Sequence, residues 1–167
     1  AMTRAVCPGS FDPVTHGHLD VIERTARIVD DVVVAVGTNI SKNALFTPDE
    51  RVEMLAEECA QWSNVGVTLF GGLLVDFCTA HDIDVISKGL RAADLSYELQ
   101  MAQMNRTLTG VDTIFLPTAP QWAFVSSSLV REVATLGGDV AAFLPAKIAE
   151  RTTARVASRN AGAATDA

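Results

Sequence analysis

Short apolar segments alternate with amphipathic helical patterns along most of this chain, and this alternation constrains the fold more than any other feature. The strand-like segments read RAVCP, DVVVAVG, VGVTLF, DVIS and DTIFL. The helical patterns between them read HLDVIERTARIV, a stretch from about Asp49 to Trp62, LLVDFCTAH and a Met-rich segment. Almost continuously apolar strands separated by helices are typical of a parallel sheet that is covered on both faces. With right-handed crossovers, the pattern predicts an α/β fold with a doubly wound, five-stranded parallel sheet and helices on both faces.

One helix start is especially well marked. Thr47 can cap the helix, Pro48 suits the first helical position, and Glu50 completes a capping box. The sequence therefore predicts that a helix begins directly after Thr47.

The length of the chain suits a single domain. At 167 residues with 49% hydrophobic content, it can fill one core. We expect residues 4–154 to form one domain. Residues 1–3 are taken as a remnant ahead of it because Ala1 precedes Met2, and residues 155–167 as a flexible, Ala-rich C-terminal tail.

Charge and hydropathy exclude several classes of function. A net charge of −7 disfavours nonspecific binding to nucleic acid, which depends on basic surface. The sequence contains neither a membrane-spanning run nor a secretion signal, so we expect no membrane association and a cytoplasmic location. The cysteines Cys7, Cys59 and Cys78 are widely spaced and lack a C-x-x-C pair, which predicts buried thiols instead of a zinc site.

The segment PGSFDPVTHGH, residues 8–18, lies between the first strand and the first helix and is unusually elaborate for a connection. Gly9 and Gly17 allow a ligand to approach the backbone, Ser10 adds a hydroxyl, and His18 lies near a helix start, where free N–H groups favour anions. The alternative is a Gly/Pro turn with a capping histidine. Residue types alone do not decide between the two.

Three further segments place polar groups at the ends of predicted strands. Lys42 follows the second strand, and Lys88 to Arg91 follow the fourth. Ser126 to Ser128 precede an apolar helical pattern after the fifth strand, where they could hold a polyphosphate or simply cap the helix. The sequence lacks G-x-G-x-x-G after the first strand and a P-loop motif, so a nucleotide must be held in another way.

Taken together, these segments resemble a known family. PGSFDPVTHGH, with Thr15-x-Gly17-His18, is similar to the signature of the nucleotidyltransferase superfamily. SKNALFTPDERV, SKGLRA followed by YELQMAQMNR, and WAFVSSSLVREVATLGGDV then resemble the bacterial phosphopantetheine adenylyltransferases over about residues 4 to 150. Two positions and one length differ from the family pattern: Ser10 replaces Thr, Lys88 replaces Arg, and GLRAADLSYE is one residue shorter.

The resemblance implies a Rossmann-like sheet, with ATP and 4'-phosphopantetheine as substrates and 3'-dephospho-coenzyme A and pyrophosphate as products. It also implies that Mg²⁺ binds the phosphates and that the chain forms a homo-oligomer, namely a hexamer. Coenzyme A is a candidate inhibitor. Carried over by position, the catalytic residues would be His18, Lys42 and Arg91. Phosphopantetheine would contact Ser10, Lys42, Leu74 and Lys88, and ATP would contact Ser10, Phe11, His18, Gly89, Leu90, Arg91, Glu98, Trp122, Ala123, Phe124, Val125, Ser126, Ser127 and Ser128.

The expected reaction is an in-line attack by the phosphate of phosphopantetheine on the α-phosphorus of ATP, with His18 stabilising the transition state. Two alternatives stay open. One is another small-molecule nucleotidyltransferase of the same fold, acting on nicotinamide mononucleotide or with a cytidylyl donor. The other is a noncatalytic nucleotide-binding module, since a fold does not determine a function.

Other residues are expected to have mainly structural roles. Met101 and Met104 share a helical face, which favours core packing or a subunit contact. His16 and His81 lack metal-ligand partners at suitable spacing. Asp12 is a further candidate, as a partner of either magnesium or Lys42. The wall facing the pantetheine arm is expected to include Leu73, Leu74 and Asn105.

Overall fold

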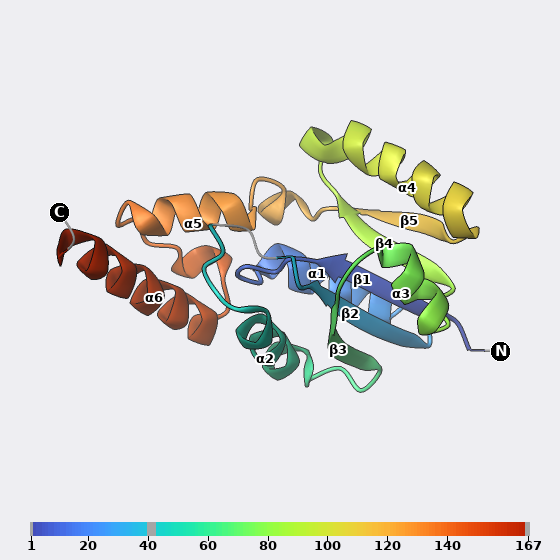
Figure 1. Ribbon diagram of the computed structural model, residues 1–167, viewed down its shortest axis with the longest axis horizontal. Helices are drawn as coiled ribbons and strands as arrows, with labels where there is room; N and C mark the ends of the chain where they lie inside the picture. Colours follow the sequence, from blue (N-terminus) through green and yellow to red (C-terminus); the bar gives the residue numbers. More distant parts are fainter. Residues whose placement is uncertain (1, 40–42, 166–167) are drawn as a thin grey trace.

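The computed structural model describes residues 2–39 and 43–165 (Figure 1). Its centre is a five-stranded parallel sheet in the order β3-β2-β1-β4-β5, which confirms the predicted class. The strands are β1 (Arg4–Gly9), β2 (Asp31–Gly37), β3 (Val65–Phe70), β4 (Val85–Leu90) and β5 (Asp112–Pro117). The helices are α1 (His16–Ala26), α2 (Pro48–Cys59), α3 (Leu74–Ala80), α4 (Leu95–Thr109), α5 (Ser127–Thr135) and α6 (Ala146–Thr165), with short 3-10 turns at Ala92–Asp94, Pro120–Trp122 and Ala141–Phe143.

Helices cover both faces of the sheet, as predicted, because each face has its own apolar cluster. The larger cluster joins Val34 of β2 to Leu55 of α2 and Val130 of α5, and it continues into α1 and α6. The smaller cluster joins Val6 of β1 to Phe77 of α3, and α4 packs on β5. The nearly continuous apolar strands of the sequence are therefore the strands that are buried on two sides.

The strand order reverses at β1. This strand pairs in parallel with β2 along one edge and with β4 along the other. The chain leaves β1 and β4 at the same edge of the sheet and turns away to opposite faces. In open sheets of this kind, such a reversal leaves a crevice beyond the carboxyl ends of the strands.

The predicted start of α2 is confirmed in detail. The Thr47 hydroxyl accepts a hydrogen bond from the Glu50 N–H, and the Glu50 carboxylate accepts one from the Thr47 N–H. Pro48 occupies the first turn, and the helix ends at Cys59, three residues before Trp62. Cys7, Cys59 and Cys78 are free and buried, as expected.

Two boundaries differ from the predictions. The flexible tail predicted from residue 155 is wrong for residues 155–165, which continue α6 and bury Val156. Strand β4 extends to Leu90, so Lys88 lies inside the strand and only Arg91 follows it. None of the described helices is both long enough and apolar enough to cross a membrane.

Candidate active site

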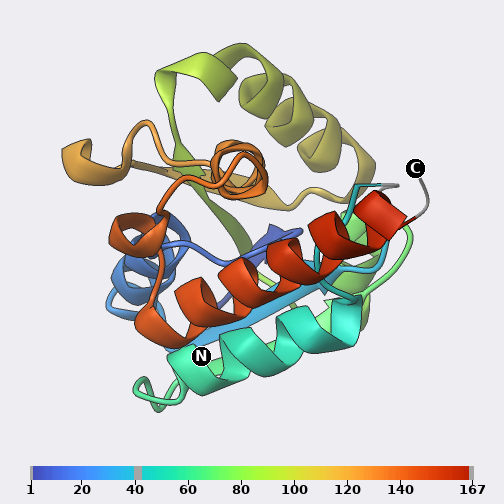
Figure 2. The ribbon, with the colours of Figure 1, turned by 90° about the vertical axis from the view of Figure 1, so that its left-hand side faces the viewer.

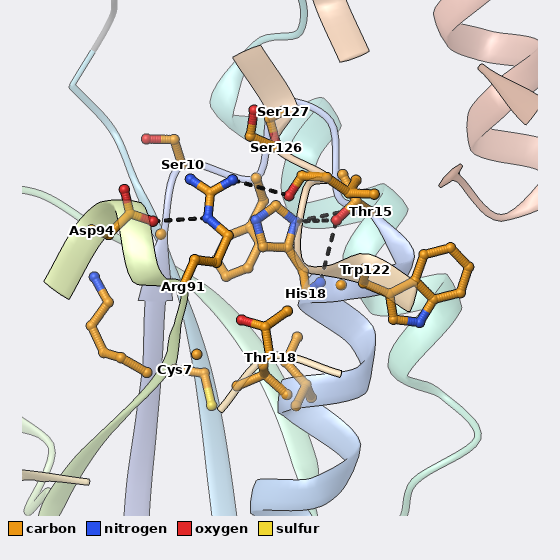
Figure 3. A pocket seen from close by; sticks show the side chains of 18 of the residues that line it. Cys7, Ser10, Thr15, His18, Arg91, Asp94, Thr118, Trp122, Ser126 and Ser127 are labelled. Carbon is orange, nitrogen blue, oxygen red and sulfur yellow. Dashed lines mark hydrogen bonds and ion pairs between the residues drawn. The ribbon is translucent and has the colours of Figure 1, made fainter. Parts of the chain in front are cut away.

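A pocket of about 370 Å³ lies at the carboxyl ends of β1 and β4, where the strand order reverses. Its walls come from the β1–α1 loop (residues 10–15), the start of α1, the end of β4, the turn after β5 and the start of α5. Figure 3 shows side chains from these elements pointing toward a shared space. Segments that are far apart in the sequence thus form one site.

The β1–α1 loop turns sharply beside β1. Phe11 has a φ of 50°, in the left-handed region. Its ring lies so close to Gly9 that a Cβ there would be 3.0 Å from the ring, which explains glycine at this position. The same ring meets His18 edge-on, with 4.9 Å between the ring centroids. Phe11 is 5% exposed and fixes one side of the imidazole.

His18 is oriented by the first turn of its own helix. The Thr15 N–H donates to His18 Nδ1 at 3.0 Å, and the His18 N–H donates to Thr15 Oγ1 at 3.3 Å, which together form a capping box. A backbone N–H can only donate, so Nδ1 must be the unprotonated nitrogen. The neutral ring therefore carries its proton on Nε2.

The surroundings of His18 keep it neutral. Burial, followed by the charges of Arg91 and Lys88, lowers the pKa of His18 from 6.5 to about 4. Both causes act against the charged form of an imidazole. At neutral pH, the site therefore contains an Nε2–H donor without an extra positive charge.

Two cations face this donor from the end of β4, and each has an acidic partner. Arg91 Nε lies 2.8 Å from Asp94 Oδ2, while its Nη1 donates to the Val125 carbonyl at 3.3 Å (Figure 3). Lys88 Nζ lies 3.2 Å from Glu98 Oε1. Side-chain exposure of 30% and 31% leaves both cations accessible from the pocket. These carboxylates orient the cations, and Asp94 lines the pocket as well.

The amino end of α5 faces the same pocket. Ser126 is its N-cap and accepts a hydrogen bond from the Leu129 N–H, and the Ser127 hydroxyl donates to the Pro13 carbonyl at 2.7 Å. Ser127 therefore joins α5 to the β1–α1 loop. The start of a helix that lines a pocket presents N–H groups toward an anion.

Asp12 departs from its predicted role. Its two carboxylate oxygens accept hydrogen bonds from the N–H groups of Leu45 and Phe46 at 2.7 and 2.8 Å, and Arg131 Nη1 lies 3.8 Å away. The residue is 4% exposed. Both oxygens of this buried carboxylate are therefore occupied by main-chain N–H groups, which leaves it poorly placed to bind a magnesium ion. Lys42, its other suggested partner, lies outside the described residues.

Most of the predicted site residues lie at this pocket. Its walls include eleven of them: Ser10, Phe11, His18, Lys88, Gly89, Arg91, Trp122, Val125, Ser126, Ser127 and Ser128. Five others do not line it: Leu74, Leu90, Glu98, Ala123 and Phe124. Glu98 contacts the site only through Lys88, and Phe124 is 60% exposed against Phe143.

Several wall residues were not predicted. Asp94, Thr118 and Arg131 line the pocket from the turn before α4, the connection after β5 and α5. The sequence contained signals for Asp94 and Thr118. Asp94 is three residues after Arg91, and Thr118 directly follows β5. Arg131 follows Ser128 by one helical turn, which was also a signal, but its contact with Asp12 across 119 residues was not visible in the sequence.

Cys7 lines the floor of the pocket from β1. Burial raises the pKa of its thiol to about 11, against the opposing effect of hydrogen bonds from Thr25 and Ser87. A thiol with this pKa stays protonated at neutral pH and is a poor nucleophile. Cys7 therefore serves as packing beneath the site.

Comparisons with known proteins find related sequences over most of the chain. The cytidylyltransferase-like family model matches residues 6–133. The phosphopantetheine adenylyltransferase of Nocardioides sp. strain JS614 is 60% identical over 94% of this chain and 99% of its own length. That of Thermobifida fusca is 54% identical over 93% of this chain and 96% of its own length.

A solved structure has the same fold. It is a protein from Vibrio parahaemolyticus assigned as a nicotinate-nucleotide adenylyltransferase, with a TM-score of 0.67 and 18% identity over 90% of this chain and 91% of its own.

Proposed function

The chain belongs to the phosphopantetheine adenylyltransferases, and from that membership we propose how its residues perform the reaction. It is a nucleotidyltransferase of coenzyme A biosynthesis, which transfers an adenylyl group from ATP to 4'-phosphopantetheine. The products are 3'-dephospho-coenzyme A and pyrophosphate. The observation that carries the mechanism is that one pocket contains a neutral imidazole donor, the cations Lys88 and Arg91 at the end of β4, and a helix amino end.

The nucleophile is an oxygen of the phosphopantetheine phosphate. A phosphomonoester has a second pKa near 6, so at neutral pH it is largely dianionic and needs no general base. A neutral His18 with a pKa of about 4 suits this reaction, because its Nδ1 is occupied by the Thr15 N–H and is not free to take a proton. The oxygen attacks the α-phosphorus of ATP in line, and pyrophosphate leaves.

The main obstacle to the reaction is the meeting of two polyanions on a protein with a net charge of −7. Lys88, Arg91 and the amino end of α5 offset this repulsion by preorganised charge. As charge develops on the α-phosphate, His18 Nε2–H donates a hydrogen bond to one of its oxygens. The N–H groups at the amino end of α5 and the hydroxyls of Ser126 and Ser128 hold the leaving phosphates, while Ser127 donates to the Pro13 carbonyl.

Magnesium would enter the site on the nucleotide. Within residues 2–39 and 43–165, no three His, Cys, Asp or Glu side chains form a metal-binding group. Mg²⁺ keeps most of its waters and binds through phosphates plus one or two carboxylates, and Asp94 is the pocket-wall carboxylate that would take this part. When bound, the ion neutralises charge on the phosphates, while the residues named above orient them.

The remaining expectations stay predictions. Lys42 and Leu74 are proposed contacts of phosphopantetheine, coenzyme A is a candidate inhibitor, and the cytoplasm is the expected location. A homo-oligomer, a hexamer in the family, is proposed because α4 exposes Tyr97, Met101, Met104 and Leu108 at 66%, 39%, 57% and 55%. Native mass spectrometry measures the number of subunits directly.

The reaction is tested by pyrophosphate release from Mg²⁺-ATP, measured with and without 4'-phosphopantetheine. Pantetheine, which lacks the phosphate, and nicotinamide mononucleotide serve as control acceptors. Release with phosphopantetheine and not with pantetheine is the expected result. Release with nicotinamide mononucleotide alone would favour another nucleotidyltransferase activity, and ATP binding without any release would indicate a noncatalytic module.

A further inference from the structure

The C-terminal helix α6 contacts the main chain of residues 44–46 through two arginines. Arg155 Nη1 donates to the Leu45 carbonyl at 2.8 Å, and Arg159 Nη2 donates to the Ala44 carbonyl at 2.6 Å. Arg155 is itself held by Glu50, 2.5 Å away, and lies over the Phe46 ring. Figure 2 shows α6 running beside α2, which supplies Glu50.

The same short segment is held from its other side by Asp12. The Asp12 carboxylate accepts from the N–H groups of Leu45 and Phe46. Carbonyls at residues 44 and 45 thus bind α6, while N–H groups at residues 45 and 46 bind the β1–α1 loop. This short segment is a main-chain bridge between α6 and Asp12.

Asp12 also connects the bridge to the active site. Its carbonyl accepts a hydrogen bond of 2.6 Å from Arg131 Nη1, and Arg131 lines the pocket that contains His18. Arg131 also lines a second hollow, together with Leu45 and Arg159. It therefore lies between the active site and the bridge. Ser10 and Phe11, two walls of the pocket, directly precede Asp12 in the chain.

We propose that Arg155 and Arg159 are positioning residues for adenylyl transfer: they hold residues 44–46 against Asp12, and this contact fixes the β1–α1 loop and Arg131 at the pocket. The proposal rests on the proposed function. Neither arginine lines the pocket that contains His18, so their effect is transmitted through the bridge.

The chain offers a matched control on the same helix. Arg151 of α6 also pairs with α2, through Glu53 at 3.9 Å. Its ion pair is on α2 and not on residues 44–46. Arg151→Ala therefore removes an arginine from the same helix face and leaves the bridge in place.

The experiment compares Arg155→Ala, Arg159→Ala, Arg159→Lys and Arg151→Ala in the pyrophosphate-release assay, at a temperature well below every Tm. A displacement of about 1 Å in a site costs about 10²-fold in rate. We expect kcat to fall about 10-fold in the two bridge alanine variants, a fraction of that effect, with KM values nearly unchanged. Arg159→Lys keeps a donor for Ala44 and should retain most activity, and Arg151→Ala should match the wild type.

A double-mutant cycle places the effect on the bridge. Asp12→Asn weakens the bridge from the other side, so its effect on kcat should be less than multiplicative with that of Arg159→Ala. If Arg155→Ala and Arg159→Ala lower Tm but keep the kcat of Arg151→Ala, the arginines are merely structural and the proposal is overturned. If the wild type itself releases no pyrophosphate with phosphopantetheine, it is the proposed function that fails.

Discussion

His18 combines two properties that rarely occur together, since it lies among cations and yet donates a hydrogen bond as a neutral ring. The main-chain N–H of Thr15 occupies Nδ1, so the proton must be on Nε2. Burial first, and then the charges of Arg91 and Lys88, oppose a second proton and so lower the pKa of the ring. The cap of α1 thus determines which tautomer of the neutral ring is present in the residue proposed to stabilise the transition state.

The role of His18 is tested by His18→Ala. Removing one donor aimed at developing charge typically costs about 10²- to 10³-fold in kcat. Because the cations and α5 remain, ATP affinity should change much less. Steady-state kinetics and ATP titration calorimetry measure the two quantities, with His81→Ala, which alters a ring stacked on Phe77, as the matched control. Near-normal turnover of His18→Ala would refute the role.

The protonation state of His18 can be observed directly. Its pKa is lowered to about 4, so the ring should stay neutral as the pH falls from 8 to 5 and gain a proton only near pH 4. ¹⁵N NMR of the unliganded protein should show protonated Nε2 and bare Nδ1 throughout that range. Titration of His18 near pH 6.5 would contradict this account.

At the scale of elements, the closeness of β4 to α1 sets the shape of the pocket. Gly89 lies in β4, and a Cβ built there would come within 2.7 Å of Val21 Cγ2 on α1. Glycine is needed at this position because the strand and the helix touch. Arg91, which lines the pocket, lies two residues further along the chain.

Gly89→Ala should therefore lower the free energy of unfolding by about 1–3 kcal/mol, the usual cost of overpacking. Shortening the neighbour should relieve the clash, so Gly89→Ala combined with Val21→Ala should be more stable than Gly89→Ala alone. Urea unfolding of the single and double variants measures both effects. Equal stability of Gly89→Ala and the wild type would show that α1 can shift at no cost.

The elements themselves could be predicted because their signals are local. Apolar alternation identified the five strands, and the Thr47–Glu50 box located the start of α2. The end of β4 was misplaced because Lys88 is polar, although it lies in the strand. The polar side chain of Lys88 lines the edge of the pocket, and a prediction from hydrophobic periodicity cannot recognise such a position.

The contacts that join distant segments could not be predicted in the same way. Asp12 meets Leu45 across 33 residues and Arg131 across 119, and no local pattern encodes either contact. The helical end of α6 was missed for a related reason. Its Ala-rich composition resembles a tail, although Arg155, Val156, Arg159 and Asn160 attach it to the rest of the chain.

At the scale of the whole molecule, the ion pair of Glu50 with Arg155 joins the first half of the chain to its C-terminal helix. The hydrogen bond from Arg155 is the main cause that lowers the pKa of Glu50 from 4.5 to about 2. A carboxyl with a depressed folded-state pKa adds stability above its unfolded pKa and loses it as the pH falls through the folded value. The window for this loss runs from about pH 4.5 to about pH 2.

Glu50→Gln should therefore be less stable than the wild type at pH 7 and nearly equal to it at pH 2. Glutamine still accepts from the Thr47 N–H, so the capping box is retained. Urea unfolding across this pH range measures the difference. Glu53→Gln is the matched control, because Glu53 is 63% exposed and lies 3.9 Å from its arginine. A gap between Glu50→Gln and the wild type that persists at pH 2 would exclude this ion pair as its source.

The reactivity of the three buried thiols can report how often the folded chain opens. Burial raises the pKa of Cys7 to about 11 and that of Cys59 to about 12, and it raises the pKa of Cys78 as well. The thiolate is the nucleophile that attacks a thiol-modifying reagent, so the folded chain should resist such reagents even at the floor of its pocket. The rate of labelling at each thiol would then measure how often the surrounding structure opens. Because the three thiols lie in β1, α2 and α3, the order in which they react would show which part of the sheet loosens first.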